Sequence, residues 1–201
     1  MLISQISKQD DVWVALFQRN NSVFLDFFMR VSILFTRFAS TSWHSNRYIT
    51  SRYELSKLAI FAGATGPYNY CFSHSKKLSA VILSSECERV SIDIEPLERQ
   101  LTKTLKVKIR ETFPSLMLSE LGIIMILECL IKVQPVSTSF GLVAGLFGDV
   151  PIEIVKLGQD NFAVNFKDKR FYSRIYILNN LFICITREKN QFPLNLEYFN
   201  D

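Results

Sequence analysis

Short apolar runs, broken by Asn, Gly and Pro, recur along most of the chain. Runs rich in β-branched and aromatic residues between such breakers are typical of β-strands. We expect strands at residues 12–17, 70–72, 78–83, 90–94, 153–157, 162–166, 171–178 and 181–186. Asn179 and Asn180 separate the last two runs and predict a two-residue hairpin turn.

Longer stretches with apolar residues at helical spacing predict helices at 23–38, 47–62, 103–110 and 118–133. Gly63 and the pair Gly66-Pro67 end the second stretch, and Pro135 ends the last. Each half of the chain thus combines helices with a β-hairpin, which predicts an α+β fold. We expect an N-terminal half over residues 1–99 and a C-terminal half over 100–201, packed together as one globular unit.

The composition is that of a folded domain, with 48% hydrophobic and 21% charged residues. The net charge of +4 is too small to argue for nucleic acid, which we do not expect as a partner. It suits a polyanionic small molecule or an acidic protein equally well.

The cysteines indicate reduced thiols rather than a disulfide framework or a zinc site. None of the four forms a CxxC pair, and the chain has only two histidines. The N-terminal residues lack the apolar run of a signal peptide, and the apolar run at 121–127 is far shorter than the roughly 20 residues of a membrane span. We therefore expect a cytoplasmic protein with no stable membrane insertion.

The segment VSIDIE at residues 90–95 has the clearest chemical pattern. Side chains alternate between the faces of a strand, so Asp93 and Glu95 lie on one face and the apolar residues on the other. Two neighbouring carboxylates repel each other unless a cation lies between them, and oxygen ligands suit Mg²⁺. The alternative is the solvated outer face of an edge strand.

Two further segments carry polar groups in unusual surroundings. Glu128 is the only charge between residues 121 and 131, and a lone buried carboxylate needs a partner or a metal. The alternative is a surface pair with Lys132, four residues later on the same face. The segment FSHS at 72–75, followed by two lysines, could grip a phosphate, although a lone histidine is more often structural.

Together these segments resemble the signature of the 4'-phosphopantetheinyl transferases, and they occur in the family's order. That signature comprises an SHS segment, a hydrophobic strand, a G(I/V)D(I/L)E strand and a helix with a Lys-Glu pair and a second Lys. The counterparts are FSHS at 72–75, AVILS at 80–84, VSIDIE at 90–95 and IIMILECLIK at 123–132, with a basic helix at 47–59 upstream. The resemblance is strongest to the longer single-chain type, typified by the enterobactin synthetase component D and surfactin-type enzymes, and covers residues from about 47 to 188.

The resemblance implies an α+β fold with two similar halves related by a pseudo-twofold axis, each with helices on a small antiparallel sheet. Coenzyme A would bind in the cleft between the halves. The enzyme would transfer 4'-phosphopantetheine to a serine of an acyl or peptidyl carrier protein and release 3',5'-ADP. We expect such a chain to work as a monomer.

Site residues carry over by matching position. Asp93 and Glu128 would hold Mg²⁺, with Glu95 as a direct or water-mediated ligand. Glu128, or a metal-bound water, would remove the serine proton, and Lys132 would contact phosphate near the reacting centre. Four residues would contact coenzyme A: Arg52, Ser73, His74 and Lys76. His74 would contact the 3'-phosphate of coenzyme A.

The chain departs from the family pattern at several positions. Leu127 stands in place of the Lys of the Lys-Glu pair, and the loss of one charged contact to the transition state costs on the order of a hundredfold in rate. Ile124 replaces an aromatic residue, Ser91 the strand Gly, and Lys76 the Gly that often follows SHS. The alternatives are a degenerate homologue that binds coenzyme A or a carrier protein without efficient transfer, and a globular domain with accidental motif matches.

Overall fold

Two antiparallel sheets form the described part of the chain. The computed structural model describes residues 3–9, 12–18, 69–75, 78–84, 88–134, 151–178 and 180–192. The first sheet has the order β1-β2-β4-β3, and its strands are β1 Ile3–Gln9, β2 Val12–Gln18, β3 Asn69–His74 and β4 Leu78–Ser84. The second has the order β5-β9-β8-β7-β6, and its strands are β5 Val90–Pro96, β6 Ile152–Lys156, β7 Asn161–Phe166, β8 Lys169–Leu178 and β9 Leu181–Arg187.

All eight predicted strands are confirmed, with small differences at their ends. Strand β1 was not predicted; it pairs antiparallel with β2, with Ser7 opposite Val14. The predicted helices at 103–110 and 118–133 correspond to α3 Lys103–Thr112 and α4 Glu120–Val133. The helices predicted at 23–38 and 47–62 lie outside the described residues. An α+β fold with small antiparallel sheets is therefore confirmed.

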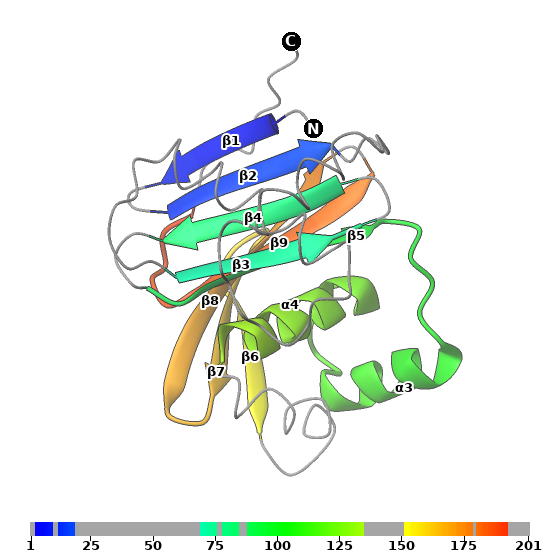
Figure 1. Cartoon of the computed structure of the whole chain (residues 1–201). Coiled ribbons are helices and arrows are strands. Elements are labelled where there is room, and N and C mark those ends of the chain that lie inside the picture. The colour runs from blue at the N-terminus through cyan, green and yellow to red at the C-terminus, as the bar shows by residue number, and fades with distance from the viewer. Residues whose placement is uncertain are drawn as a thin grey trace, which may run out of the picture.

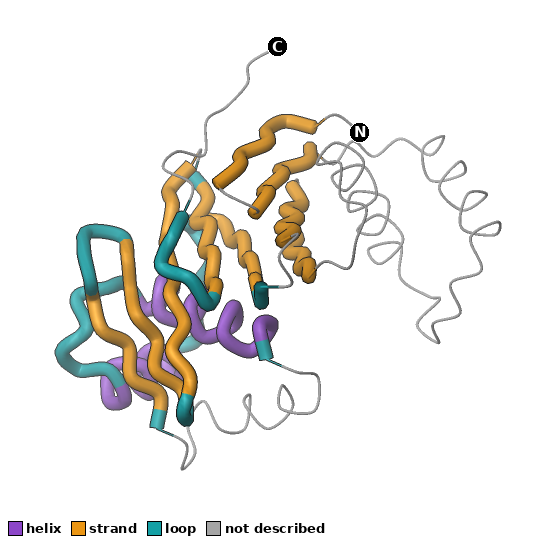
Figure 2. The backbone as a smooth tube through the Cα atoms, turned by 90° about the vertical axis from the view of Figure 1, so that its left-hand side faces the viewer, coloured by secondary structure: helices purple, strands orange, loops and turns teal. Residues whose placement is uncertain are grey.

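The second sheet is the middle layer of the structure. Ile92 and Ile94 of β5 and Ile183 of β9 pack against β2 and β4 of the first sheet. On the opposite face, Cys184 of β9 packs with the apolar residues of α4. In Figure 1, α4 lies below the first sheet and in front of the orange strands of the second, and Figure 2 shows the helices beside the second sheet. Strand β5 consequently has buried residues on both faces.

Strand β5 belongs to the sheet built mainly from C-terminal residues. It pairs with β9 from Val90 opposite Arg187 to Pro96 opposite Leu181. Strand β5 follows β3 and β4 in the chain, but those two strands pair with each other and β5 pairs with β9. A border between residues 99 and 100 therefore separates β5 from its hydrogen-bonding partner.

Local sequence signals start α4 and form the last hairpin. Ser119 caps α4, because its side chain accepts a hydrogen bond from the backbone N–H of Gly122 at 3.2 Å. Asn180 has a φ of 62° in the predicted turn between β8 and β9, a conformation that Asn adopts more easily than most residues. The Asn180 carbonyl also accepts from the N–H of Leu97 at 2.9 Å, which fixes the turn after β5.

No helix in the described ranges is long and apolar enough to cross a bilayer.

A buried ion pair joins the segment before β5 to the end of β9. Arg187 Nε donates to Glu88 Oε1 at 2.9 Å, and Arg187 Nη2 donates to Glu88 Oε2 at 2.5 Å. The N–H of Lys189 donates to the same carboxylate at 2.8 Å. Both side chains of the pair are almost fully buried, so each charge depends on the other for solvation.

Removal of Glu88 is expected to destabilise the fold. Glu88→Ala leaves the Arg187 guanidinium buried without its counter-ion, and we expect a loss of about 3–5 kcal/mol in the free energy of unfolding, measured by urea denaturation. Glu188→Ala is the control, because it removes the partly exposed pair with Arg89 and is expected to cost about 1 kcal/mol or less. Equal losses for the two variants would contradict this account.

Candidate metal centre

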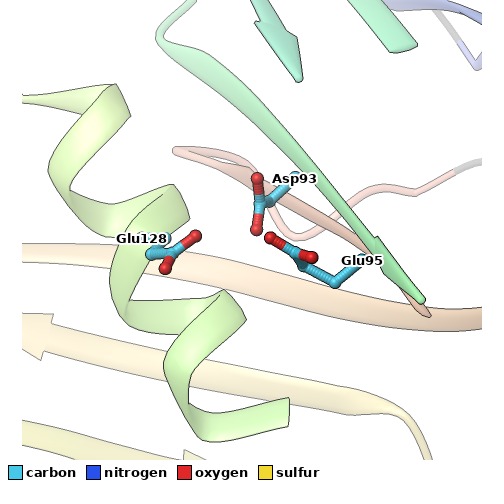
Figure 3. A group of neighbouring side chains, drawn as sticks. All are labelled: Asp93, Glu95 and Glu128. Carbon is cyan, nitrogen blue, oxygen red and sulfur yellow. The ribbon is translucent and has the colours of Figure 1, made fainter. Parts of the chain in front are cut away.

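Three carboxyl groups from two elements converge between β5 and α4. Asp93 and Glu95 come from β5, and Glu128 comes from α4. One oxygen of each lies within 4.8 Å of the others, and Figure 3 shows the three groups turned toward one another. Alternation along β5 places Asp93 and Glu95 on the face that α4 covers. Ser91 lies on the same face of β5, and its Oγ donates to the Cys129 carbonyl of α4 at 2.8 Å. This hydrogen bond fixes the position of α4 against β5.

Asp93 is the most deeply buried member, with 3% exposure. Its Oδ1 accepts hydrogen bonds from Lys132 Nζ and from Ser73 Oγ, both at 2.6 Å. Its Oδ2 is buried and has no hydrogen-bond partner among the described residues. An unsatisfied buried carboxylate oxygen is costly, so this atom favours a bound cation.

Lys132 keeps Asp93 ionised. Burial alone would raise the pKa of Asp93, but the charge and hydrogen bond of Lys132, together with the Ser73 hydroxyl, hold the pKa below its ordinary value. Burial alone would lower the pKa of Lys132, but the charge of the Asp93 carboxylate has the larger effect and raises that pKa. Lys132 Nζ also donates to the Ile92 carbonyl at 3.2 Å, which ties α4 to the backbone of β5.

Glu128 has the opposite environment. Burial, followed by the negative charge of Asp93, raises the pKa of Glu128 to about 7. Burial also raises the pKa of Glu95, although the nearby Arg99 guanidinium works against it. At neutral pH, Glu128 can therefore exchange a proton with its surroundings while Asp93 stays charged.

Arg99 is the functional candidate that sequence reasoning missed. Its Nη1 donates to Glu95 Oε1 in a short hydrogen bond, and its Nη2 lies 3.4 Å from Glu128 Oε1. The signal in the sequence is weak, since Arg99 follows Glu95 by four residues across a turn at Pro96 rather than along a helix. Only the approach of α4 to this turn reveals the contact.

The donor set fits a hard divalent cation. All the donors are carboxylate oxygens, one of them is buried without a partner, and the three residues come from two rigid elements. Mg²⁺ prefers oxygen ligands and is typically held by a few carboxylates together with substrate phosphates and water. Asp93, Glu95 and Glu128 are the residues that would hold it.

The structure bears on both alternatives for the acidic residues. Strand β5 lies at an edge of its sheet, as the first alternative has it, but Asp93 is buried. The face of β5 that carries Asp93 is covered by α4 and is not a solvated outer face. Lys132 pairs with Asp93 instead of forming a surface pair with Glu128 along the helix. Glu128 pairs with Arg99 instead.

The predicted coenzyme A contacts are only partly described. Ser73 is buried, and its hydroxyl accepts from the N–H of Ile94 at 3.1 Å while it donates to Asp93. His74 ends β3 beside Ser73 and, by the alternation of a strand, projects from the other face. Arg52 and Lys76 lie outside the described residues. A role of these four residues in binding coenzyme A stays a prediction.

Leu127 does not face the carboxyl groups. It is fully buried in the core between α4 and the second sheet, and neighbouring residues of a helix project about 100° apart. The position that holds Lys in the family pattern is therefore a core position in this chain, and the cation next to Glu128 is Arg99.

Comparisons with known proteins assign no family to this chain: no family model matches it, and no curated protein matches it. The function must therefore be argued from the carboxyl cluster and its surroundings.

The raised pKa of Glu128 predicts a pH-dependent stability. Its folded pKa of about 7 lies above the ordinary value of 4.5, so its contribution is fully favourable below about pH 4.5 and is lost as the pH rises to 7. Glu128→Gln should therefore raise the Tm of the metal-free protein at pH 8, by about 2–4 °C after allowance for solvent screening, and leave it nearly unchanged at pH 4.5. Glu120→Gln is the control, because Glu120 pairs with Arg110 away from the carboxyl cluster and its removal should not raise the Tm.

Lysine at position 127 is expected to destabilise the protein rather than restore a site. Leu127→Lys buries a charge without a partner in the core, and we expect a loss of about 3 kcal/mol or more in the free energy of unfolding. Leu127→Met, which conserves volume, should lose less than about 1.5 kcal/mol. A Leu127→Lys variant as stable as the wild type would show that this side chain can reach the carboxyl groups.

Proposed function

We propose that this chain transfers the 4'-phosphopantetheine group of coenzyme A to a serine of an acyl or peptidyl carrier protein. One observation carries the proposal. Two of the segments that resemble the transferase signature, VSIDIE and the helix with Glu128 and Lys132, meet in space, and their carboxyl groups lie within 4.8 Å of one another. Accidental motif matches would give no reason for this convergence.

In the proposed enzyme, Asp93, Glu95 and Glu128 would hold Mg²⁺. The ion would neutralise the charge of the diphosphate of coenzyme A and polarise its oxygens, which is most of what phosphoryl transfer requires. Asp93 can serve as a permanent ligand because Lys132 and Ser73 keep it ionised. Its Oδ2 has no hydrogen-bond partner among the described residues and would be the atom that binds the ion.

Glu128 is the proposed general base. Burial and the charge of Asp93 raise its pKa to about 7 in the metal-free chain, and a bound Mg²⁺ would lower that pKa, so Glu128, or a metal-bound water, would take the proton at neutral pH. The serine oxygen forms a bond to the β-phosphorus of coenzyme A, the bond from that phosphorus to the bridging oxygen breaks, and 3',5'-ADP leaves. The serine proton passes to Glu128 or to that water.

The remaining carried-over residues complete the proposal. Lys132 has donor capacity beyond its bonds to Asp93 and Ile92, and would act near the reacting phosphate. His74, with Arg52, Ser73 and Lys76, would contact coenzyme A. The cofactor would lie between two similar halves related by a pseudo-twofold axis, in a cytoplasmic monomer.

The second candidate is a chain that binds coenzyme A or a carrier protein without efficient transfer. Leu127 favours it, because a core leucine stands where the family pattern has a cation beside the phosphates. The proposed metal ligands and Lys132 are the same for both candidate functions, so only a transfer assay separates the two functions.

The test is the mass of the carrier. The protein is incubated with Mg²⁺, coenzyme A and a panel of apo carrier proteins, and we expect a mass gain of one phosphopantetheine group on serine. Asp93→Ala and Glu128→Ala should reduce the rate on the order of a hundredfold or more. Glu120→Ala should not, because it changes a glutamate of the same helix that pairs with Arg110 outside the cluster. Coenzyme A binding without any gain would favour the second candidate, and neither binding nor gain would refute both.

A further inference from the structure

Arg99 is held at the edge of the carboxyl cluster by the turn that follows β5. Its N–H donates to the Pro96 carbonyl at 3.0 Å, and the turn is fixed to the β8–β9 hairpin through Leu97 and Asn180. The backbone of Arg99 is therefore positioned, but its side chain extends over the surface of the site, where 33% of it is exposed.

The two cations of the site divide the three carboxyl groups between them. Lys132 contacts the buried Asp93 and the Ile92 carbonyl. Arg99 contacts Glu95 on β5 and Glu128 on α4 at the more exposed end. Its guanidinium thus joins two candidate metal ligands from different elements and reduces the repulsion between them.

A divalent cation cannot share this arrangement at low cost. An ion bound by Glu95 and Glu128 would lie within a few ångströms of a guanidinium that contacts both residues. Two positive charges at such a distance repel strongly in a partly buried site. Lys132 and Arg99 are similarly exposed, but Lys132 Nζ is held at 2.6 Å by the buried Asp93 carboxylate and at 3.2 Å by the Ile92 carbonyl, whereas Arg99 contacts two partly exposed carboxylates. Arg99 is therefore the cation that can leave.

We infer that Arg99 and a divalent cation are alternative occupants of the Glu95–Glu128 pair. The inference rests on the metal site of the proposed function and concerns its regulation. Without metal, Arg99 keeps the two carboxylates together, and metal binding displaces its guanidinium. The displaced guanidinium stays tethered by its turn at the mouth of the site, where it can meet phosphate oxygens and supply a cation that Leu127 does not.

The test is Mn²⁺ binding to the full chain without coenzyme A, followed through the electron paramagnetic resonance signal of free Mn²⁺. Arg99→Gln should bind Mn²⁺ on the order of tenfold more tightly than the wild type. Arg99→Lys keeps the charge, but its compact ammonium does not bridge two carboxylates as the guanidinium fork does, so it should also bind more tightly than the wild type. Arg110→Gln is the matched control, because it removes an arginine paired with Glu120, about two turns of α4 before Glu128, and should leave the affinity unchanged. Thermal melts of each variant report whether it is folded.

The outcomes separate this inference from the proposed function. Tighter binding in Arg99→Gln with wild-type affinity in Arg99→Lys would indicate a general effect of charge and overturn the alternative occupancy. Wild-type binding that Asp93→Asn abolishes, with no effect of either Arg99 variant, would also overturn it while the metal site stands. Binding in neither the wild type nor Arg99→Gln would refute both the inference and the metal site.

Discussion

The ion pair between Asp93 and Lys132 sets the conditions for the rest of the site. It places a carboxylate with 3% exposure under a helix, at a point where β5 is covered on both faces. Such a charge is tolerated only because the ammonium and the Ser73 hydroxyl compensate for its lost hydration. The same pair, together with the hydrogen bond from Ser91 to the Cys129 carbonyl, ties α4 to β5, so it contributes to both stability and site geometry.

The properties of the neighbouring groups follow from this buried charge. Burial raises the pKa of Glu128, and the charge of the nearby ionised Asp93 raises it further. The resulting excess of negative charge requires a cation at the exposed end of the cluster. Arg99 fills that need in the structure, and a divalent ion would do so in the proposed enzyme. The site is best understood as a balance between three carboxyl groups and the cations that can approach them.

The strands and the two described helices were predictable from the sequence because their signals are local. Apolar runs, the Ser119 cap and the Asn179-Asn180 turn act within a few residues. The partner of β5 was not predictable in this way, since its pairing with β9 joins residues that are about ninety positions apart in the chain. Sequence proximity favoured β3 and β4, but tertiary packing decided otherwise.

Local pattern alone marks three acidic residues as unusual: alternation in VSIDIE puts Asp93 and Glu95 on one face, and Glu128 has apolar surroundings. Only the tertiary structure decided what those residues contact. It paired Lys132 with Asp93 and brought Arg99 to Glu128, because the path of α4 across β5 sets those distances. A local pattern fixes the direction of a side chain relative to its own element, whereas charge balance and burial depend on what packs against that element.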